Sequence, residues 1–390
     1  MMHSILFILR IVAIAGVVSS SLYYLLCLWS AAAFLCERKP GKGARPTRDL
    51  PPVSILKPLK GIDPEIYESF RSHCRQDYPE YEIIFGVSDP NDPSVESVKA
   101  LQREFPERRI QLVVSPNILG ANVKVSNLAQ MMGEARYDYL IVNDSDIRVD
   151  PDYLRRVITP LADSKVGMVT CLYRGVAAPT IASRLEALGI STDFCAGVLA
   201  ACQLESGIRF GLGSTLAFRR SDLEKIGGFP SILNHLADDY ELGKRIAQLG
   251  LTVILSDVVI ETFLPAYDLQ SFLAHQLRWA RGVRDARAGG YFGLAFTFGF
   301  FWALLALVAS AGAPWSCAML AFILVLRFAV AFVVGWKVLR DPQVLRDAWL
   351  IPLRDLFAVG VWIVSLGGHT VIWRGDRFTL KDGKLTRLDP

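Results

Sequence analysis

The stretch YLIVNDSDIRV at residues 139–149 decides the fold. Residues 139–142 are apolar and partly β-branched, which predicts a short buried strand. Asp144 and Asp146 follow the end of that strand. An Asp-X-Asp pair in this position suits a hard divalent cation that also binds a diphosphate. Taken alone, the pair is a weak signal, because acidic turn residues after strands are common.

Strand-like and helix-like patterns alternate upstream of residue 139. The strand-like runs are 51–57, 82–87 and 110–114, and the helix-like stretches are 64–75, 94–105 and 122–132. Ser94 stands where the cap of the second helix is expected. This alternation predicts a doubly wound α/β sheet of parallel strands, and the ligands of such a sheet lie beyond the carboxyl ends of its strands.

Other acidic residues stand at similar positions. Asp89 and Asp92 follow the second strand, while Asp238 and Asp239 open a predicted helix over 240–249. Acidic residues in a first helical turn are favoured by the helix dipole alone. A structural role for these residues does not exclude a chemical one.

Two segments are open to two interpretations each. Residues 211–215, GLGST, form either a phosphate-binding loop or a tight turn beside the site, and they lack the lysine of a P-loop. Residues 181–204 are amphipathic with few charges, so they either lie on a membrane surface or form a buried helix of the domain.

The composition predicts membrane segments at both ends. The 390 residues are 52% hydrophobic with a mean hydropathy of +0.32, which is high for a soluble protein. Residues 4–35 carry one charge, Arg10, and exceed the roughly 20 residues that span hydrocarbon. A signal peptide is the alternative, but the apolar run is too long and charged residues at 37–39 replace a cleavage site. We therefore expect a membrane anchor over 1–37.

Basic residues crowd the segment after this anchor. They are Arg38, Lys39, Lys42, Arg45 and Arg48. Such clusters lie on the cytoplasmic side of a membrane. The sequence therefore predicts a cytoplasmic catalytic domain over 50–288.

Three further apolar stretches, 291–311, 315–336 and 355–373, have nearly spanning length. If all three cross, the basic tail over 376–390 ends outside, against the charge rule. One stretch is therefore expected to be re-entrant or interfacial, and the charges of Arg354 and Asp355 point to the last. The predicted divisions are the anchor 1–37, the catalytic domain 50–288, membrane segments 289–375 and the tail 376–390.

The net charge indicates which partners the protein binds, and the cysteines indicate in which compartment the domain lies. The net charge is +4, and no long basic run alternates with aromatic residues, which argues against nucleic acid as a partner. The seven cysteines form no CxxC pair and no metal-ligand spacing with the five histidines. Reduced, structural cysteines suit a cytosolic catalytic domain.

Six motifs in a fixed order are far more specific than any one of them. They are KPLKG at 57–61, SDPNDP at 88–93, DSDIRV at 144–149, GLGSTLAFRR at 211–220, LADDYELGKRI at 236–246 and HQLRW at 275–279. Through them the chain resembles the ceramide glucosyltransferase family over nearly its whole length, which implies the GT-A fold. It is most similar to the bacterial branch associated with hopanoid biosynthesis. That branch implies transfer of N-acetylglucosamine from its UDP derivative to bacteriohopanetetrol.

The resemblance also implies the roles of single residues in the catalytic domain. Nucleotide-sugar binding is implied for Lys57, Asp89, Asp92, Lys124 and Asp144, metal binding for Asp144 and Asp146, and base catalysis for Asp239. Lys124 lies on the predicted helix 122–132 together with Asn127. The competing interpretation of these two residues is a solvated helix face.

The closing motif of the family is Gln or Arg, two variable residues, then Arg-Trp. Arg278 and Trp279 match it, which implies contacts with the diphosphate or the acceptor. His275 replaces the leading residue, and Gln276 beside it is a candidate substitute. The competing interpretation of Trp279 is an aromatic residue at the membrane interface.

The chemistry of such a transfer needs a base and a cation, because a lipid hydroxyl is a poor nucleophile and a diphosphate leaves with negative charge. We expect Asp239 to remove the hydroxyl proton during an inverting attack. Mg²⁺ or Mn²⁺ on Asp144 and Asp146, helped by Arg278, would stabilise the leaving group. No second carboxylate is nominated for a retaining double displacement.

The expected enzyme is therefore a multi-pass glycosyltransferase of the inner (cytoplasmic) membrane, with a UDP-sugar donor and a membrane lipid as acceptor. The first alternative is a ceramide glucosyltransferase that uses UDP-glucose, and diacylglycerol is a third acceptor. A processive polysaccharide synthase is a further alternative, although such enzymes usually have more membrane spans. A non-catalytic membrane scaffold would not need these aspartates.

Overall fold

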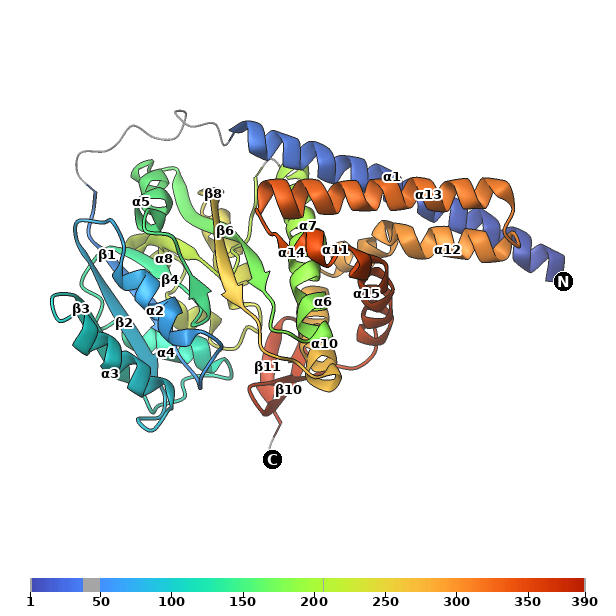
Figure 1. The fold of residues 1–390 in the computed structure, drawn as a ribbon. Coiled ribbons are helices and arrows are strands. Elements are labelled where there is room, and N and C mark those ends of the chain that lie inside the picture. Colours follow the sequence, from blue (N-terminus) through green and yellow to red (C-terminus); the bar gives the residue numbers. More distant parts are fainter. Residues whose placement is uncertain (1, 38–49, 206, 389–390) are drawn as a thin grey trace.

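The chain forms an α/β domain joined to a bundle of long apolar helices (Figure 1). The structure is a computed structural model that describes residues 2–37, 50–205 and 207–388. The basic cluster from Arg38 to Arg48, on which the predicted cytoplasmic orientation depends, lies outside the described residues.

An eight-stranded sheet forms the centre of the domain, in the order β3-β2-β1-β4-β7-β6-β8-β5. Its strands are β1 (Val53–Pro58), β2 (Tyr81–Val87), β3 (Arg109–Val114), β4 (Tyr139–Val142), β5 (Ile147–Arg148), β6 (Val166–Val176), β7 (Leu216–Arg219) and β8 (Thr252–Phe263). The first four strands are parallel, as predicted. The rest of the sheet is mixed, because β7 runs antiparallel to β4 and β6, and β5 runs antiparallel to β8. The prediction of parallel strands is therefore wrong for this half, where a long excursion separates β4 from its neighbour β7.

Helices and short helical turns connect the strands. They are α2 (Ile66–Cys74), α3 (Ser94–Glu104), α4 (Val123–Met131), α5 (Tyr153–Ile158), η1 (Thr159–Ala162), α6 (Ile181–Gly189), η2 (Ile190–Phe194), α7 (Cys195–Leu204), α8 (Arg220–Lys225), η3 (Phe229–Ile232), α9 (Asp238–Gln248) and α10 (Leu269–Ala286). Side chains of β1 alternate between two buried clusters, with Ile55 in one and Leu56 in the other. Phe70 of α2 belongs to the first cluster and Leu128 of α4 to the second, so helices cover both faces of the sheet.

The three helices predicted upstream of residue 139 are confirmed as α2, α3 and α4. Asn122 caps α4 by accepting a hydrogen bond from the Val125 backbone N–H. The predicted cap of α3 is wrong, because Ser94 is its first helical residue and donates to Asp92 instead. Pro93 precedes the helix and has no side-chain oxygen, so the Asp92 carboxylate accepts from the Ser94 backbone N–H at 2.9 Å.

The helical bundle combines the predicted N-terminal anchor with the predicted C-terminal membrane segments. Its members are α1 (Met2–Glu37), α11 (Ala288–Gly293), η4 (Leu294–Thr297), α12 (Gly299–Ala309), α13 (Pro314–Val330), η5 (Ala331–Val338), α14 (Gln343–Arg346), η6 (Ala348–Leu350) and α15 (Ile351–Ser365). Helix α1 packs against α12 and α13, and the three extend together away from the sheet (Figure 1). By length and composition, four helices of the described residues are able to cross a membrane, or five if a pair bent by 48° counts as one span.

The segment 181–204 is one of these four candidates, but 72% of its apolar window is buried. It comprises α6, η2 and α7, which pack against β6 and α1. The buried interpretation of this segment is therefore the one that agrees with the structure.

The C-terminal residues form a small sheet rather than a tail. The strands β9 (Thr370–Trp373), β10 (Asp376–Lys381) and β11 (Lys384–Arg387) pair in the order β11-β10-β9. The predicted boundary between residues 375 and 376 therefore falls inside a hairpin. The last predicted apolar stretch, 355–373, also differs, because its helix ends at Ser365 before Gly368, which has φ +74°.

This small sheet is attached to the catalytic domain. The Leu236 backbone N–H donates to Gly383, and the Leu385 N–H donates to Asn234. Leu236 also packs into an apolar cluster with Phe378 and Leu380. The two units therefore lie on the same side of any membrane that the helices cross, which requires an even number of crossings between them.

Candidate active site

A cavity of about 1200 Å³ joins the carboxyl end of β4 to the helical bundle. At the sheet end it is lined by Asp144, Asp146 and Asp239. At the other end it is lined by Tyr24 of α1 and Arg327 of α13. One continuous space therefore connects the acidic residues predicted from the sequence with the apolar helices.

The Asp-X-Asp pair lies where β4 ends, and a buried lysine supports its backbone. Lys57 of β1 is fully buried and donates to the Asp144 backbone carbonyl at 2.8 Å. Burial lowers the pKa of Lys57 to about 7, although Asp146 and Asp144 oppose this shift. Asp146 accepts from the Thr262 hydroxyl at 2.6 Å, and burial together with the charge of Asp144 raises the pKa of Asp146 to about 6.

Asp239 is the second residue of α9, and its carboxylate faces Asp144 across Gly213. A Cβ atom added at Gly213 would lie 3.1 Å from Asp239 Oδ2 and 3.3 Å from Asp144 Oδ2. A side chain at this position would therefore push the two carboxylates apart. Burial, and then the charge of Asp238, raises the pKa of Asp239 to about 6. A carboxylate with such a pKa is a suitable general base near neutral pH.

Lys124 of α4 is the cation at the centre of these acids. Its Nζ lies 2.7 Å from Asp144 Oδ1 and 3.3 Å from Asp238 Oδ2. These charges raise its pKa above the ordinary value, although burial opposes them. Asp238 also accepts from the Asn122 amide at 3.3 Å, so it is held in place, whereas Asp239 has no side-chain partner among the described residues.

The closing motif lies on α10, and His275, Gln276, Arg278 and Trp279 line the cavity. The Arg278 guanidinium lies 5.8 Å from the centroid of the Trp373 ring and forms no ion pair with the described residues. Burial lowers the pKa of Arg278 to about 10. Because this guanidinium lines the cavity without an ion pair, its charge is available to an anionic group.

The residues next to Arg278 contact another helix. Gln276 donates to Glu186 of α6 at 2.5 Å, and His275 Nδ1 lies 3.5 Å from the same carboxylate. The His275 ring stacks on Tyr267 and meets Trp279 edge-on. His275 and Gln276 therefore position α10 against α6, while both still line the cavity.

Not every predicted residue lies in this cavity. Lys57, Asp89 and Asp92 are absent from its lining. Asp89 is exposed and accepts from the Asn91 backbone N–H, and Asp92 accepts from the Gly61 N–H at 2.8 Å. Both carboxylates thus shape the loops after β1 and β2. Asn127 does line the cavity and accepts from the Ser88 hydroxyl.

The cavity residues that the sequence analysis missed include Arg374 and Asp63. Arg374, in the turn after β9, forms a two-pronged ion pair with Asp63, with both N–O distances at 3.1 Å. Asp63 also accepts from the hydroxyl of Ser145, the central residue of the Asp-X-Asp pair. Arg374 and Asp63 are 311 residues apart in the chain, and no local pattern predicts their contact.

The acidic pair fits a divalent cation. No group of three or more His, Cys, Asp or Glu side chains in the described part of the chain is arranged to hold a metal alone. Asp144 and Asp146 nevertheless supply hard oxygen donors, and burial together with the charge of Asp144 raises the pKa of Asp146. Magnesium and manganese sites that also bind phosphates use one or two carboxylates and take their other ligands from the phosphates and water.

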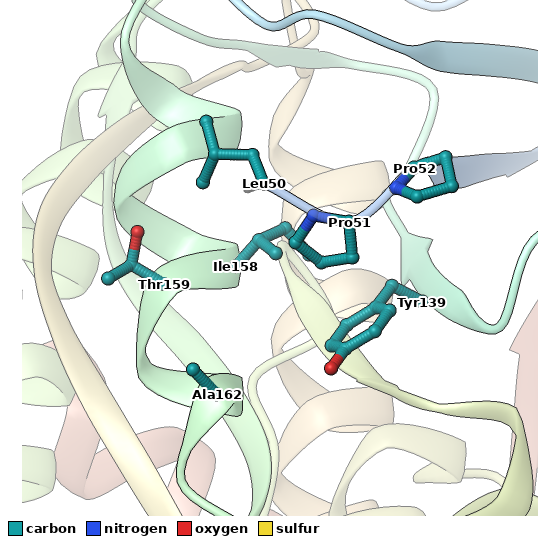
Figure 2. A pocket seen from close by; sticks show the side chains of 7 residues that line it. All are labelled: Leu50, Pro51, Pro52, Tyr139, Ile158, Thr159 and Ala162. Carbon is teal, nitrogen blue, oxygen red and sulfur yellow. The ribbon is translucent and has the colours of Figure 1, made fainter. Parts of the chain in front are cut away.

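A second pocket, of about 480 Å³, lies at the opposite end of the sheet. It is formed by residues before β1, at the start of β4 and near η1 (Figure 2). None of its seven lining residues carries an acidic or basic side chain. It lies at the amino ends of β1 and β4, whereas ligands of parallel sheets bind at the carboxyl ends, so it is not the candidate site.

Comparisons with known proteins agree with this geometry. A family model described as Glycosyl transferase family 21 matches residues 12–386. Ceramide glucosyltransferase 3 of Caenorhabditis elegans is 27% identical over 233 residues, which cover 60% of this chain and 50% of the relative. Ceramide glucosyltransferase of Komagataella phaffii is 33% identical over 161 residues, which cover 39% of this chain and 31% of the relative. The matched segments thus span half or less of these curated relatives.

A solved structure shows the same fold. The mannosyltransferase PcManGT from Pyrobaculum calidifontis, in complex with GDP-Man and Mn²⁺, has a TM-score of 0.56 at 22% identity. The match covers 92% of this chain and 97% of that chain. The α/β domain therefore has the GT-A fold, as predicted.

Proposed function

We propose, because the chain belongs to glycosyl transferase family 21, that it transfers a sugar from a nucleotide-sugar donor to the hydroxyl of a membrane lipid, with glucose and ceramide as the favoured pair. One observation carries this proposal. The cavity that contains Asp144, Asp146 and Asp239 continues into the apolar helical bundle. A lipid that enters from the bundle can therefore reach the base through the same cavity.

Asp239 is the proposed base. The lipid hydroxyl donates its proton to the Asp239 carboxylate while the hydroxyl oxygen attacks the anomeric carbon of the sugar. Asp238 holds Lys124 beside this carboxylate, and the charge of Lys124 keeps the pKa of Asp239 from rising further. Gly213 leaves the space between Asp239 and Asp144 free for the reacting group.

Arg278 and the acidic pair would bind the leaving group. Arg278, which has no ion pair in the described residues, would bind the diphosphate as its negative charge grows. Asp144 and Asp146 would hold Mg²⁺ or Mn²⁺, and this cation would neutralise the diphosphate oxygens. Lys124 would lose part of its pairing with Asp144 and gain a phosphate partner.

We propose direct displacement with inversion, which needs one carboxylate as a base. A retaining double displacement needs a carboxylate as nucleophile on one face of the sugar. Asp238 is bound by Lys124 and Asn122, while Asp144 and Asp146 are assigned to the cation. Of these four carboxylates, Asp239 is therefore the one left to act as the base.

The choice of substrate follows the relatives. Both reported curated relatives are ceramide glucosyltransferases, which favours glucose and ceramide over the N-acetylglucosamine and bacteriohopanetetrol expected from the sequence. The hopanoid acceptor remains the second candidate, because it is also a lipid whose terminal hydroxyl can enter from the bundle. We further propose that the catalytic domain and the C-terminal sheet lie on the cytoplasmic side of the inner membrane.

A donor and acceptor matrix tests the proposal. The purified full chain is incubated with Mn²⁺ or Mg²⁺ and UDP-glucose or UDP-N-acetylglucosamine, with ceramide, bacteriohopanetetrol or diacylglycerol as acceptor, and lipids are identified by mass spectrometry. We expect hexosyl-ceramide, and we expect a chelator to abolish it. An N-acetylhexosaminyl hopanoid would support the second candidate, and no glycolipid from folded protein in any combination would refute the proposal.

The rate should also depend on pH through Asp239. Its pKa is raised to about 6 in the folded protein, and the base must be unprotonated. The turnover number at saturating substrates should therefore fall as the pH drops below about 6 and level off above it. A bound cation lowers this pKa further, so the acid limb lies at or below that value. A pH profile of lipid glycosylation measures the limb, and a limb well above pH 7 would contradict the assignment.

A further inference from the structure

A second group of charged side chains lines the cavity, on the apolar helices rather than on the sheet. Asp193 of η2, Arg327 of α13, and Arg354 and Asp355 of α15 all line it. Each belongs to a helix that is long and apolar enough to span a membrane. Charged side chains in such segments are costly and generally mark a functional site.

Two of these four side chains, Arg327 and Asp355, use their hydrogen-bonding capacity within the protein. Arg327 is 2% exposed, and its Nε donates to Asp355 at 2.9 Å. Its Nη2 donates to Asp193 Oδ1 at 2.6 Å and to the Thr192 hydroxyl at 3.0 Å. These bonds join α13, α15 and η2. Arg327 and Asp355 are therefore explained by a structural role alone.

The other half has unused hydrogen-bonding capacity. The Asp193 side chain is 36% exposed, and its Oδ2 lies 3.9 Å from Arg354 Nη2, beyond hydrogen-bond distance. Arg354 is 9% exposed, and its Nε and Nη1 have no hydrogen-bond partner in the described part of the chain. Its one hydrogen bond among the described residues goes to Gln276 at 3.3 Å. A buried guanidinium that is so poorly satisfied is costly unless a ligand completes its contacts.

The position of Arg354 is set by the backbone beside it. A Cβ atom at Gly189 would lie 2.5 Å from Arg354 Nε, so the glycine provides the space that the guanidinium occupies. Phe194, next to Asp193 in the chain, packs on Trp279 with ring centroids 6.0 Å apart. An aromatic contact thus joins the segment that carries Asp193 to the helix that carries Arg278.

We propose that Asp193 and Arg354 form a subsite for a polar group of the lipid acceptor. The carboxylate accepts a hydrogen bond and the guanidinium donates one, so the ligand must both donate and accept. A secondary amide, as in ceramide, meets this requirement through its N–H and C=O. The ester of diacylglycerol accepts only. This subsite rests on the proposed function, because it assigns the part of the lipid acceptor that determines specificity.

Direct binding separates the subsite from the reaction. The probes are a short-chain fluorescent ceramide and its N-methyl analogue, which lacks the amide donor. We expect the full-length wild type to bind ceramide roughly tenfold or more tightly than the analogue, since a hydrogen bond to a charged group is lost. Asp193→Ala should bind the two probes equally, because Asp193 is the proposed acceptor.

A matched control addresses the loss of a buried ion pair as such. Asp347 is 1% exposed, pairs with Arg184 and does not line the cavity. Asp347→Asn should keep the preference for ceramide. Asp193→Ala leaves Arg327 bound to Asp355, so it should fold, and Arg354→Gln provides a second variant that should weaken the binding of both probes alike.

The outcomes distinguish this proposal from the proposed function. A wild type that binds the two probes equally or binds neither, or an Asp193→Ala variant that still prefers ceramide, would overturn the subsite. Preferential binding without any transfer to ceramide would support the subsite and count against the proposed function. Transfer to ceramide with an unchanged preference in Asp193→Ala would support the proposed function and overturn the subsite.

Discussion

Asp239→Asn should lower the turnover number by about 100-fold to 10,000-fold, which is the range that a general base contributes. Asparagine has nearly the same shape but cannot accept the proton of the lipid hydroxyl. The carboxylate of Asp239 lies beside Gly213, opposite Asp144, where an incoming hydroxyl would meet the sugar. Binding of the nucleotide sugar should change little, because Asp144, Asp146 and Arg278 remain.

The measurement is a steady-state comparison of kcat, with donor affinity determined separately by calorimetry. Glu241→Gln is the matched control. Glu241 lies on the same helix α9, pairs with Arg245 and Lys244, and is outside the cavity lining. The control should keep nearly full activity. An Asp239→Asn enzyme within tenfold of the wild type would show that another group accepts the proton.

Arg278→Gln should reduce kcat by about 100-fold to 1,000-fold, the usual effect of removing one group that stabilises transition-state charge. Arg278 forms no ion pair in the described residues and lies over Trp373 at the cavity wall. Its charge is therefore available to the diphosphate as the bond to the sugar breaks. Arg278→Lys should recover part of the rate, because it keeps the charge but loses the planar geometry.

Arg281→Gln controls for this substitution. Arg281 lies on the same helix, three residues away, and donates to the backbone carbonyls of Gly367 and Thr370. It does not line the cavity, so its loss should affect stability more than kcat. If both arginine variants lowered kcat equally while remaining folded, the assignment of Arg278 to the leaving group would fail.

The sequence predicted the parts of the site that follow strands. Asp144 and Asp146 come directly after β4, and parallel strands place their carboxyl ends at one edge of a sheet. Asp239 was found through the order of motifs rather than through periodicity. For these residues, a local pattern contains the information that positions the side chain.

Contacts between distant segments were not predictable in this way. The strands β9 to β11 are short, and the segment of the domain that they contact begins more than a hundred residues upstream, at Asn234. Arg374 meets Asp63 through that sheet. The mixed half of the central sheet has the same cause, because the direction of β7 depends on a long excursion after β4.

Two residues that the resemblance assigned to nucleotide-sugar binding make contacts within the protein instead. Asp92 uses its oxygens on the backbone of Gly61 and on Ser94, so it joins the loop after β1 to the start of α3. Lys57 is buried beneath Asp144 and supports its backbone. A motif identifies that a residue matters, whereas its contacts decide whether it binds a ligand or positions one that does.

The anomeric configuration of the product tests the central claim most directly. The account has one base, Asp239, on the face of the sugar opposite the leaving diphosphate, and therefore one displacement. Proton NMR of the glycolipid made by the purified wild type should show a configuration opposite to that of the sugar nucleotide. A product with the donor's configuration would contradict the account, because a single displacement from the face opposite the diphosphate inverts the anomeric carbon.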